Sequence, residues 1–462
     1  MTASAARQLF GTDGIRAVAG EPPLDPTTIF AVGLALAHTL RRDTDHPTII
    51  LGRDTRESSP GIAATLAAGL RAASARVESA GIVPTPAVAF LARTHKFHAG
   101  VVISASHNPW QDNGIKLFGA DGFKLPDPVE LAMEDEIRHH AAQPGTRSVA
   151  LDPAYQLPLE YNSDFQADYI QFLIDSVPGL KLDGLRIVVD CANGAAAAVA
   201  PELFRRLNAN HSAHITLLNT SPTGRNINDG CGALHPAYVA AETERRGATL
   251  GLTFDGDADR CMLAGAHNNV LNGDAILLAV ARDLKARGLL NGDMVVATTM
   301  SNMGLEAALK RSGIRMVRAP VGDRYVLQQM QRHKASLGGE QSGHILLPHL
   351  ATTGDGLLTA LVVLDLIARS GRSIEELTAD LKVFPQVIVN VKVREKRPLE
   401  SIPGVAASIR AAEEDLKDSG RVVIRYSGTE ALARVMIEAE SEASMRRHAT
   451  TIADAIRHEL GV

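Results

Sequence analysis

The sequence predicts an α/β protein in which three similar α/β domains, with mixed and mostly parallel sheets, precede a smaller C-terminal α+β domain. Two patterns and the length of the chain support this fold class. Short β-branched runs that end in Gly, Ser, Asp or Asn alternate with Ala- and Leu-rich segments of helical period. Near-continuous apolar strands joined by such helices favour parallel sheets covered on both faces. The 462 residues correspond to about three units of ~150 residues.

Three sets of expected strands follow one another along the chain. They cover 47–54, 76–87 and 98–109, with a helix over 61–73 between the first two; then 185–194, 212–219 and 248–260; then 294–302, 314–324 and 335–343. Beyond these, the runs 386–393 and 421–440 alternate in polarity, which is typical of a half-exposed antiparallel sheet. We therefore expect domains at 1–155, 156–258, 259–370 and 371–462. Because open α/β sheets bind ligands at the carboxyl ends of their strands, functional residues are expected in the loops there.

The composition excludes several classes of protein. With 47 Lys and Arg against 52 Asp and Glu, the net charge of −5 gives no basic surface for nucleic acid. Cys191, Cys231 and Cys261 form no CxxC pair, so neither a disulfide framework nor a zinc site is expected. The first ten residues do not resemble a secretory signal, and Asp365 interrupts the apolar run from Gly356 before the ~18 residues that a membrane span needs. We therefore expect a soluble, cytoplasmic protein with no nucleic-acid or membrane partner.

The strongest local signal is DGDADR, which places Asp255, Asp257 and Asp259 directly after an apolar strand. Three carboxylates so close together repel each other unless a cation neutralises them, and an all-oxygen set suits Mg²⁺. An EF-hand is excluded by spacing, because Arg260 occupies the position that needs Gly and Ala266 the position that needs Glu. A solvated acidic turn is the alternative to a metal site.

A second signal is SASHNPWQDNGIK, which begins at Ser104 on the end of an expected strand. Ser106 is a candidate for a phosphorylated nucleophile, with His107 beside it and Lys116 further along the loop. The same composition is also common in ordinary turns. A serine hydrolase is disfavoured because no GxSxG elbow surrounds either serine.

Two further loops suit the binding of phosphate and of sugar hydroxyls. In RYSGTE, Arg425 offers a fork-shaped cation, and Ser427, Gly428 and Thr429 offer hydroxyls and open backbone amides. A plain hairpin connection is the alternative for this loop.

In GEQSGH, Glu340 and Ser342 lie in a Gly-flanked loop where a carboxylate and a hydroxyl could bind sugar hydroxyls. A plain loop at a strand end is the alternative. The N-terminal FGTDGIR adds Arg16. The sequence contains no GxxxxGK[ST] and no GxGxxG, so neither nucleotide-driven nor nicotinamide chemistry is supported. Taken together, a cation site, a candidate phospho-acceptor, a phosphate clamp and a hydroxyl-binding loop indicate phosphoryl transfer on a phosphosugar.

Seven motifs, FGTDGIR, GRDTR, SASHNP, DNGIK, DGDADR, GEQSGH and RYSGTE, occur in this order over essentially the whole chain. In this the sequence resembles the α-D-phosphohexomutase superfamily. GEQSGH, where the mannose and glucose enzymes usually carry GEMSGH, resembles the phosphoglucosamine mutases, as do VVDCANG, NINDGCG, TTMSNMGL, VGDRYVL and TTGDGLLTAL. The sequence departs from the usual pattern at Ala17, where Gly is common, and at Tyr426 and Ala431, where Pro is common. These departures concern loop stiffness more than chemistry.

The resemblance implies four domains around a central cleft and a role for each motif. Ser106 would be the phosphoserine and would hold one Mg²⁺ together with Asp255, Asp257 and Asp259. The transferring phosphoryl group would be surrounded by Arg16, His107, Lys116 and Arg260. Of these, Lys116 is a candidate acid/base. The substrate would be bound by Glu340 and Ser342 at its hydroxyls, and by Arg425, Ser427, Gly428 and Thr429 at the phosphate that does not react.

The resemblance also implies a reaction. It is the interconversion of glucosamine 6-phosphate and glucosamine 1-phosphate in amino-sugar and peptidoglycan precursor synthesis, through a phosphoserine enzyme and a bisphosphorylated sugar. Glucosamine 1,6-bisphosphate or a similar sugar would be the activator, and a homodimer is one candidate assembly. The alternatives are a phosphomannomutase or phosphoglucomutase, a Mg²⁺-dependent phosphosugar hydrolase, and a phosphosugar-binding protein without activity.

Overall fold

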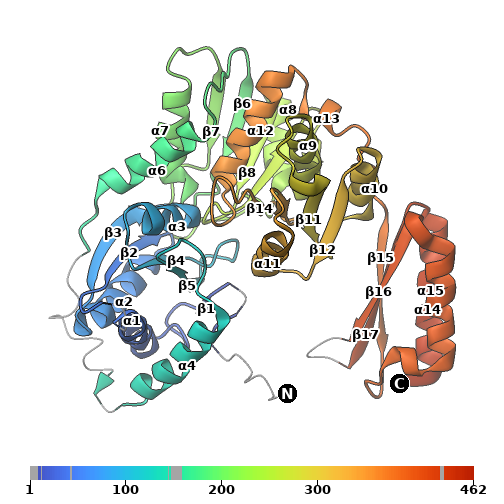
Figure 1. The fold of residues 1–462 in the computed structure, drawn as a ribbon, viewed down its shortest axis with the longest axis horizontal. Helices are drawn as coiled ribbons and strands as arrows, with labels where there is room; N and C mark the ends of the chain where they lie inside the picture. The colour runs from blue at the N-terminus through green and yellow to red at the C-terminus, as the bar shows by residue number, and fades with distance from the viewer. Residues whose placement is uncertain are drawn as a thin grey trace. The chain divides into compact units, whose positions relative to one another are not determined.

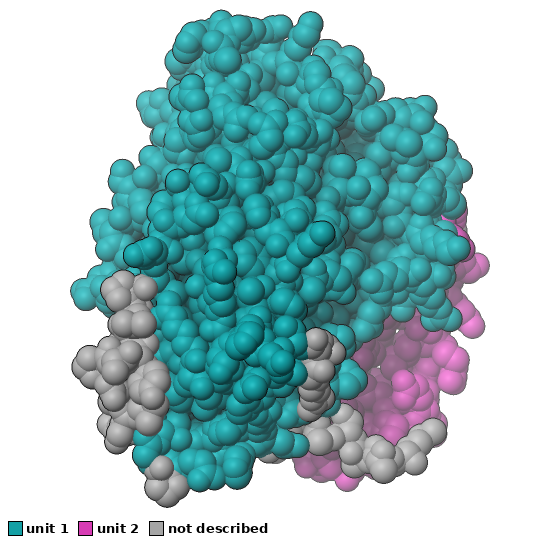
Figure 2. Space-filling view, turned by 60° about the vertical axis from the view of Figure 1, so that its left-hand side comes forward, with its two compact units in different colours: residues 1–299, 317–377 teal, residues 300–316, 378–462 magenta. Residues whose placement is uncertain are grey.

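A computed structural model describes residues 9–11, 13–41, 44–143, 145–146, 159–426 and 431–461. Contacts divide the chain into two compact units, shown in two colours in Figure 2. Unit 1 consists of residues 1–299 and 317–377, and unit 2 of residues 300–316 and 378–462.

The first sheet has the strand order β1-β5-β4-β2-β3 (Figure 1). Strands β3, β2 and β4 are parallel, whereas β5 and β1 run antiparallel to their neighbours. The elements are β1 (Ile15–Val18), α1 (Pro26–Leu40), β2 (Thr48–Arg53), α2 (Ser59–Ala72), β3 (Arg76–Ile82), α3 (Thr85–Thr94), β4 (Ala99–Ile103), β5 (Asp112–Gly119) and α4 (Asp127–Ala141).

The period of two along these strands decides which helix covers which face. Ile49 and Leu51 of β2 belong to the apolar core that α1, α2 and α4 share. Ile50 and Gly52, which alternate with them, point the other way, and on that face Gly52 and Gly100 lie under Val88 of α3. A Cβ at Gly52 would stand 2.5 Å from a methyl group of Val88. The absence of a side chain at Gly52 therefore lets α3 lie directly on the sheet.

The second sheet repeats the plan of the first, with the order β10-β9-β8-β6-β7. Strands β7, β6 and β8 are parallel, and β9 and β10 return antiparallel. The elements are α6 (Ser163–Asp175), β6 (Arg186–Asp190), α7 (Ala196–Leu207), β7 (His214–Leu218), α8 (Pro236–Arg245), β8 (Leu250–Phe254), β9 (Cys261–Ala264) and β10 (Val270–Leu271).

The third sheet is shorter and has the order β12-β11-β13-β14. Its strand β13 is parallel to β11 and antiparallel to β14. The elements of this part of the chain are α9 (Gly273–Ala286), η1 (Asn291–Asp293), β11 (Met294–Thr298), β12 (Arg315–Ala319), α11 (Asp323–His333), β13 (Gly338–Gly339), β14 (Ile345–Leu346), α12 (Gly356–Ser370) and α13 (Ile374–Leu377).

Unit 2 contains an antiparallel sheet in the order β15-β17-β16 with a core of its own. Val435 and Ile437 of β17 are fully buried in this core, together with Ile452 and Ile456 of α15. Its elements are α10 (Met303–Arg311), β15 (Gln386–Lys392), η2 (Leu399–Ser401), α14 (Pro403–Leu416), η3 (Lys417–Ser419), β16 (Gly420–Tyr426), β17 (Leu432–Ala439) and α15 (Glu442–Leu460).

The predicted fold class is confirmed: three mixed sheets with helices precede an antiparallel α+β part. The expected end of the second domain at 258 differs from the extent of its sheet, because β9 and β10 continue that sheet to Leu271. The polar loop DGDADR therefore connects two strands of this sheet, β8 and β9, and does not end the domain. In the described part of the chain, no helix has the length and apolar character needed to cross a membrane.

A buried polar pair joins α6 to the start of α12. The hydroxyl of Tyr169 donates to Asp355 Oδ2 at 2.8 Å, and Asp355 caps α12 by accepting a hydrogen bond from Leu358 N. Both side chains are almost completely buried. Burial disfavours the charged carboxylate and raises the pKa of Asp355 from 3.8 to about 6.

We predict that Asp355→Asn changes how stability depends on pH. Because the folded-state pKa lies above the unfolded one, the folded protein binds the extra proton. The contribution of Asp355 to the unfolding free energy is therefore full below about pH 4 and falls by ~3 kcal/mol as the pH rises through about 6. Asparagine can cap the helix without titrating. The melting temperature of the variant, measured from pH 4 to 7, should therefore rise relative to that of the parent protein; a constant difference would contradict the assignment.

Candidate active site

The three sheets present their predicted site residues at equivalent places. Ser106 lies between β4 and β5, the aspartates of DGDADR lie between β8 and β9, and Glu340 lies between β13 and β14. In each sheet this loop follows a strand parallel to its neighbour and precedes an antiparallel strand. One topological position thus supplies the nucleophile candidate, the carboxylates and the sugar-binding candidate.

Ser106 is held against the acidic loop. Its side chain is buried, and its Oγ donates to Asp255 Oδ2 at 2.5 Å. The same Oγ lies 3.3 Å from Nδ1 of His107. The close approach of the two loops depends on Gly256, because a Cβ there would stand 2.5 Å from the carbonyl oxygen of Ser106. The structure thus brings together two motifs that are about 150 residues apart, since the Ser106–Asp255 separation in sequence is 149.

The three aspartates form a buried carboxylate cluster. One oxygen from each of Asp255, Asp257 and Asp259 lies within 4.8 Å of the others. Burial raises the pKa of Asp255 well above 3.8, and repulsion from Asp259 and Asp257 raises it further. Asp257 Oδ1 and Asp259 Oδ1 are buried and accept no hydrogen bond from the described residues. Buried oxygen atoms normally have a partner, so these atoms suit a hard cation such as Mg²⁺.

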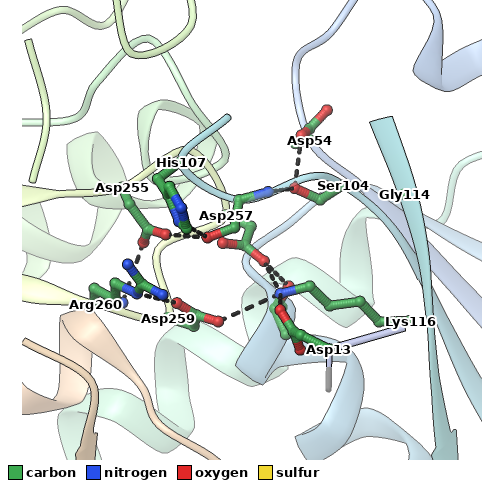
Figure 3. A network of polar contacts seen from close by, with 12 residues as sticks. Asp13, Asp54, Ser104, His107, Gly114, Lys116, Asp255, Asp257, Asp259 and Arg260 are labelled. Carbon is green, nitrogen blue, oxygen red and sulfur yellow. Dashed lines mark hydrogen bonds and ion pairs between the residues drawn. The ribbon is translucent and has the colours of Figure 1, made fainter. Parts of the chain in front are cut away.

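Lys116 of β5 partly neutralises the negative charge of the three aspartates (Figure 3). Its ammonium lies 2.7 Å from Asp257 Oδ2, 2.9 Å from Asp13 Oδ2 and 3.4 Å from Asp259 Oδ2. Burial alone would lower the pKa of Lys116, but attraction to the three carboxylates raises it well above 10.5. Lys116 is therefore a cation in this arrangement and can offset the charge of a phosphoryl group and donate hydrogen bonds to it.

Asp13 is the centre of a second group of charges. Besides Lys116 it pairs with Arg16 and Lys124. Burial opposes its ionisation, yet attraction to Lys116, Lys124 and Arg16 holds the pKa of Asp13 well below 3.8. Lys124 also pairs with Asp323 at 2.6 Å, so this chain of charges links the first sheet to the start of α11.

A cavity of about 500 Å³ opens beside these groups. Its lining contains the cations Arg16 and Arg260 as well as His107, Asp259 and Glu340. Burial, with repulsion from Arg260 and Arg16, lowers the pKa of His107 to about 4. A volume of this size suits a small anionic ligand.

The loop after β13 closes another part of the cavity. Glu340 accepts hydrogen bonds from Gly322 N at 2.9 Å and from Ser342 Oγ at 3.2 Å. His344 of the same motif lies 3.6 Å from Asp259 Oδ1 and 3.7 Å from Asp323 Oδ2. Although burial disfavours a charged ring, Asp259 raises the pKa of His344 to about 9. His344 thus adds a positive charge to the site.

A neighbouring cavity of about 620 Å³ shares His107 with the first and contains Trp110. The guanidinium of Arg225 lies over the indole ring, 4.9 Å from its centroid, and pairs with Glu57 at 2.6 Å. Trp110 is the only tryptophan of the chain. It lies in the same loop as Ser106.

The structure therefore groups most, but not all, of the predicted residues. Those in unit 1 are Arg16, Ser106, His107, Lys116, Asp255, Asp257, Asp259, Arg260, Glu340 and Ser342. Arg425 is an exposed residue of β16 in unit 2, and Ser427, Gly428 and Thr429 lie outside the described residues. Sequence reasoning did not single out Asp13, Lys124, Asp323 or His344. Asp13, Asp323 and His344 stand inside the quoted motifs FGTDGIR, VGDRYVL and GEQSGH, so those motifs were the available signal.

Four domain families match the chain in order. They are phosphoglucomutase/phosphomannomutase alpha/beta/alpha domain I over residues 7–144, domain II over 167–268, domain III over 272–384 and the C-terminal domain over 388–455. The chain therefore belongs to the phosphoglucomutase/phosphomannomutase family, the class that the three repeated sheets and their polar loops had suggested.

Named relatives show which group within this family the chain belongs to. A phosphoglucosamine mutase of Koribacter versatilis (strain Ellin345) is 56% identical over 461 residues, which cover 99% of this chain and 98% of the relative. A phosphoglucomutase/phosphomannomutase family protein of Burkholderia thailandensis has a similar structure, with a TM-score of 0.74, 23% identity and coverage of 98% and 99% of the two chains. The structure of Aspergillus fumigatus N-acetylphosphoglucosamine mutase, solved with GlcNAc-6P and magnesium, is also similar. It has a TM-score of 0.62 and 20% sequence identity, and the match covers 98% of this chain and 96% of that chain. Within the family, the chain belongs with the phosphoglucosamine mutases.

We predict that Asp257→Asn weakens divalent-ion binding. Replacing one carboxylate removes a charged ligand from an all-oxygen site, so the affinity for Mn²⁺, used as a paramagnetic stand-in for Mg²⁺, should fall at least about tenfold. Titration followed by electron paramagnetic resonance measures this directly. Asp229→Asn is the matched control, because Asp229 is exposed and lies outside the cluster. Equal Mn²⁺ affinity in parent and Asp257→Asn would refute the metal site.

Proposed function

We propose that this chain is an enzyme that interconverts glucosamine 6-phosphate and glucosamine 1-phosphate through phospho-Ser106 and a bisphosphorylated sugar. The observation that carries the proposal is the 2.5 Å contact between Ser106 Oγ and Asp255 Oδ2. It puts a hydroxyl nucleophile against a carboxylate cluster suited to a hard cation. The likeness to the Koribacter phosphoglucosamine mutase over 99% of the chain supports the choice of substrate.

The reaction requires two phosphoryl transfers. In the first, a hydroxyl of the substrate attacks the phosphorus of phospho-Ser106; the P–O bond to Ser106 breaks, a P–O bond to the sugar forms, and the proton lost by the substrate hydroxyl is balanced by one that the departing Ser106 Oγ takes up. In the second, Ser106 Oγ attacks the phosphorus of the other phosphate of the turned bisphosphate; a P–O bond to Ser106 forms, the P–O bond to the sugar breaks, and the proton lost by the Ser106 hydroxyl is balanced by one that the released sugar oxygen takes up. Because the transition state of such transfers is loose and highly charged, the enzyme contributes mainly position and positive charge.

The residues present fit a magnesium ion. Asp255, Asp257 and Asp259, with an oxygen of Ser106 or its phosphate, would hold it. When bound, Mg²⁺ supplies positive charge that stabilises the phosphoryl group in transfer. Lys116, Arg16, His107 and Arg260 would surround that group as further donors, with Lys116 as the candidate acid/base. The magnesium of the Aspergillus enzyme agrees with the choice of ion.

The two ends of the sugar need different partners. Glu340 and Ser342, which lie in one loop and hydrogen-bond to each other, would accept and donate hydrogen bonds to the sugar hydroxyls. Arg425 with Ser427, Gly428 and Thr429 would clamp the phosphate that does not react. A single clamp lets one site process both isomers, because either phosphate can occupy it while the other end meets Ser106.

Several finer features complete the proposal. We expect one Mg²⁺ per chain and activation by glucosamine 1,6-bisphosphate or a similar sugar, because an enzyme that has lost its phosphoryl group must regain it. We also expect a cytoplasmic enzyme with no nucleic-acid partner and with a homodimer as its candidate assembly.

We predict that Ser106→Ala abolishes the isomerisation. In a coupled assay that starts from glucosamine 6-phosphate, the rate should fall by more than about a thousandfold, because no other group can carry the phosphoryl intermediate. Intact-mass measurement should show a phosphorylated fraction in the parent and none in the variant. Mannose and glucose 6-phosphates serve as competing substrates in the same assay. Three results would overturn the mechanism: near-normal turnover of Ser106→Ala, transfer of labelled phosphate from the substrate to Ser104, or release of inorganic phosphate as the main product.

We predict that Arg425→Ala lowers kcat/KM in both directions of the reaction. The loss of charged hydrogen bonds to the clamped phosphate should cost about 1.5–3 kcal/mol, or roughly a 10- to 150-fold decrease. Arg446→Ala is the control, since Arg446 is an arginine of unit 2 that pairs with Glu442 within its own helix. An effect confined to one direction far from equilibrium would exclude a single clamp.

A further inference from the structure

The motif GRDTR has no role in the reaction described so far. It ends β2 and continues into the loop before α2. Its second arginine, Arg56, has no exposed surface and forms an ion pair with Asp54, whose carboxylate is equally buried, at 2.8 Å from Nε to Oδ2. A buried ion pair of this kind requires several further hydrogen bonds to offset the loss of water.

The loop that carries Ser106 supplies those hydrogen bonds. Arg56 Nη2 donates to the carbonyl oxygens of Ser106 at 2.9 Å and Asn108 at 2.8 Å. Its Nη1 donates to the carbonyl oxygen of Asp112 at 3.0 Å and to that of Pro109. With the bond from Nε to Asp54, all five N–H groups of the guanidinium are used. The loop is therefore wrapped around Arg56, and the guanidinium has no donor left for a phosphate.

The backbone N–H of Ser106 is also connected to this ion pair, through the side chain of Ser104. Ser106 N donates to Ser104 Oγ at 2.9 Å, and Ser104 Oγ donates to Asp54 Oδ2 at 2.7 Å. Figure 3 shows the link from Ser104 to Asp54 beside the acidic cluster. The backbone of Ser106 is thus fixed at both its N–H and its C=O by one buried pair, Asp54 and Arg56.

This fixation holds Ser106 in an unfavourable conformation. Its φ is +54°, a left-handed value that a residue with a side chain adopts only when the surroundings enforce it. In that conformation Oγ meets Asp255. Without the hydrogen bonds to its N–H and C=O, Ser106 would relax to a more favourable conformation, and its hydroxyl would move away from the acidic cluster.

We propose that Arg56, Asp54 and Ser104 are positioning residues that aim Ser106 at the reacting phosphoryl group. The inference rests on the proposed role of Ser106 as phospho-acceptor. Arg56 touches neither substrate nor phosphate and acts through the backbone of the loop. Misplacement of a reacting atom by about 1 Å can slow a reaction by roughly 10²-fold without changing the affinity for substrate.

The experiment compares two serines that bind the same carboxylate. Ser104→Ala removes the hydroxyl that links Asp54 to Ser106. Ser59→Ala, the matched control, removes an equally buried hydroxyl that donates to Asp54 Oδ1 at 2.7 Å but does not contact Ser106. Arg56→Lys keeps the charge next to Asp54 and loses the fork of donors. For each protein we would measure kcat and KM, the Mn²⁺ affinity, and the rate of Ser106 phosphorylation by a hexose bisphosphate in a single turnover.

We expect Ser104→Ala and Arg56→Lys to slow phosphorylation of Ser106 and kcat by roughly 10- to 100-fold, with KM and Mn²⁺ affinity within about threefold of the parent. Ser59→Ala should match the parent in all four quantities. Parent-like phosphorylation rates in both test variants would overturn the inference, and so would a rise in KM at constant kcat, which would make Arg56 a substrate ligand. If the parent itself is not phosphorylated on Ser106, the proposed function fails instead.

Discussion

The repulsion among three buried carboxylates is the constraint on which the rest of the site depends. Asp255, Asp257 and Asp259 lie too close together to be ionised without compensation. Lys116 offsets part of their charge from the first sheet, and His344 does so from the third. Two oxygens remain without a hydrogen bond among the described residues. The cluster therefore holds segments from all three sheets together by charge, and the same imbalance creates the demand for a cation.

The repetition of one strand plan explains how these segments meet. Each of the three sheets carries its functional loop between the last parallel strand and the antiparallel strand that follows it. The loops can differ freely in sequence because the strands fix where they begin and end. One copy offers a hydroxyl, the second carboxylates, and the third a carboxylate with a hydroxyl. One architectural position thus presents three different sets of chemical groups.

Local patterns in the sequence were enough to predict the strands that precede the site loops, the acidic loop and the Ser106 loop, but not the antiparallel strands that follow those loops, β5, β9 and β14. Periodicity and turn composition act over a few residues, and each of these features lies within such a span. The pairing of Lys124 with Asp323, 199 residues apart, could not be predicted in this way, because it depends on how two sheets face each other. The same holds for Arg56, whose burial against the Ser106 loop has no signature in GRDTR itself. Topology, not spacing, decides these contacts.

The placement of Trp110 has a practical consequence. The chain has only this one indole, it belongs to the loop that is wrapped around Arg56, and a guanidinium lies over its ring. Indole emission responds to nearby charge and to solvent. The protein therefore carries a single native fluorophore in the loop of the proposed phospho-acceptor Ser106, so a change of charge in this loop can be tested for by emission in the unmodified chain, without an attached dye.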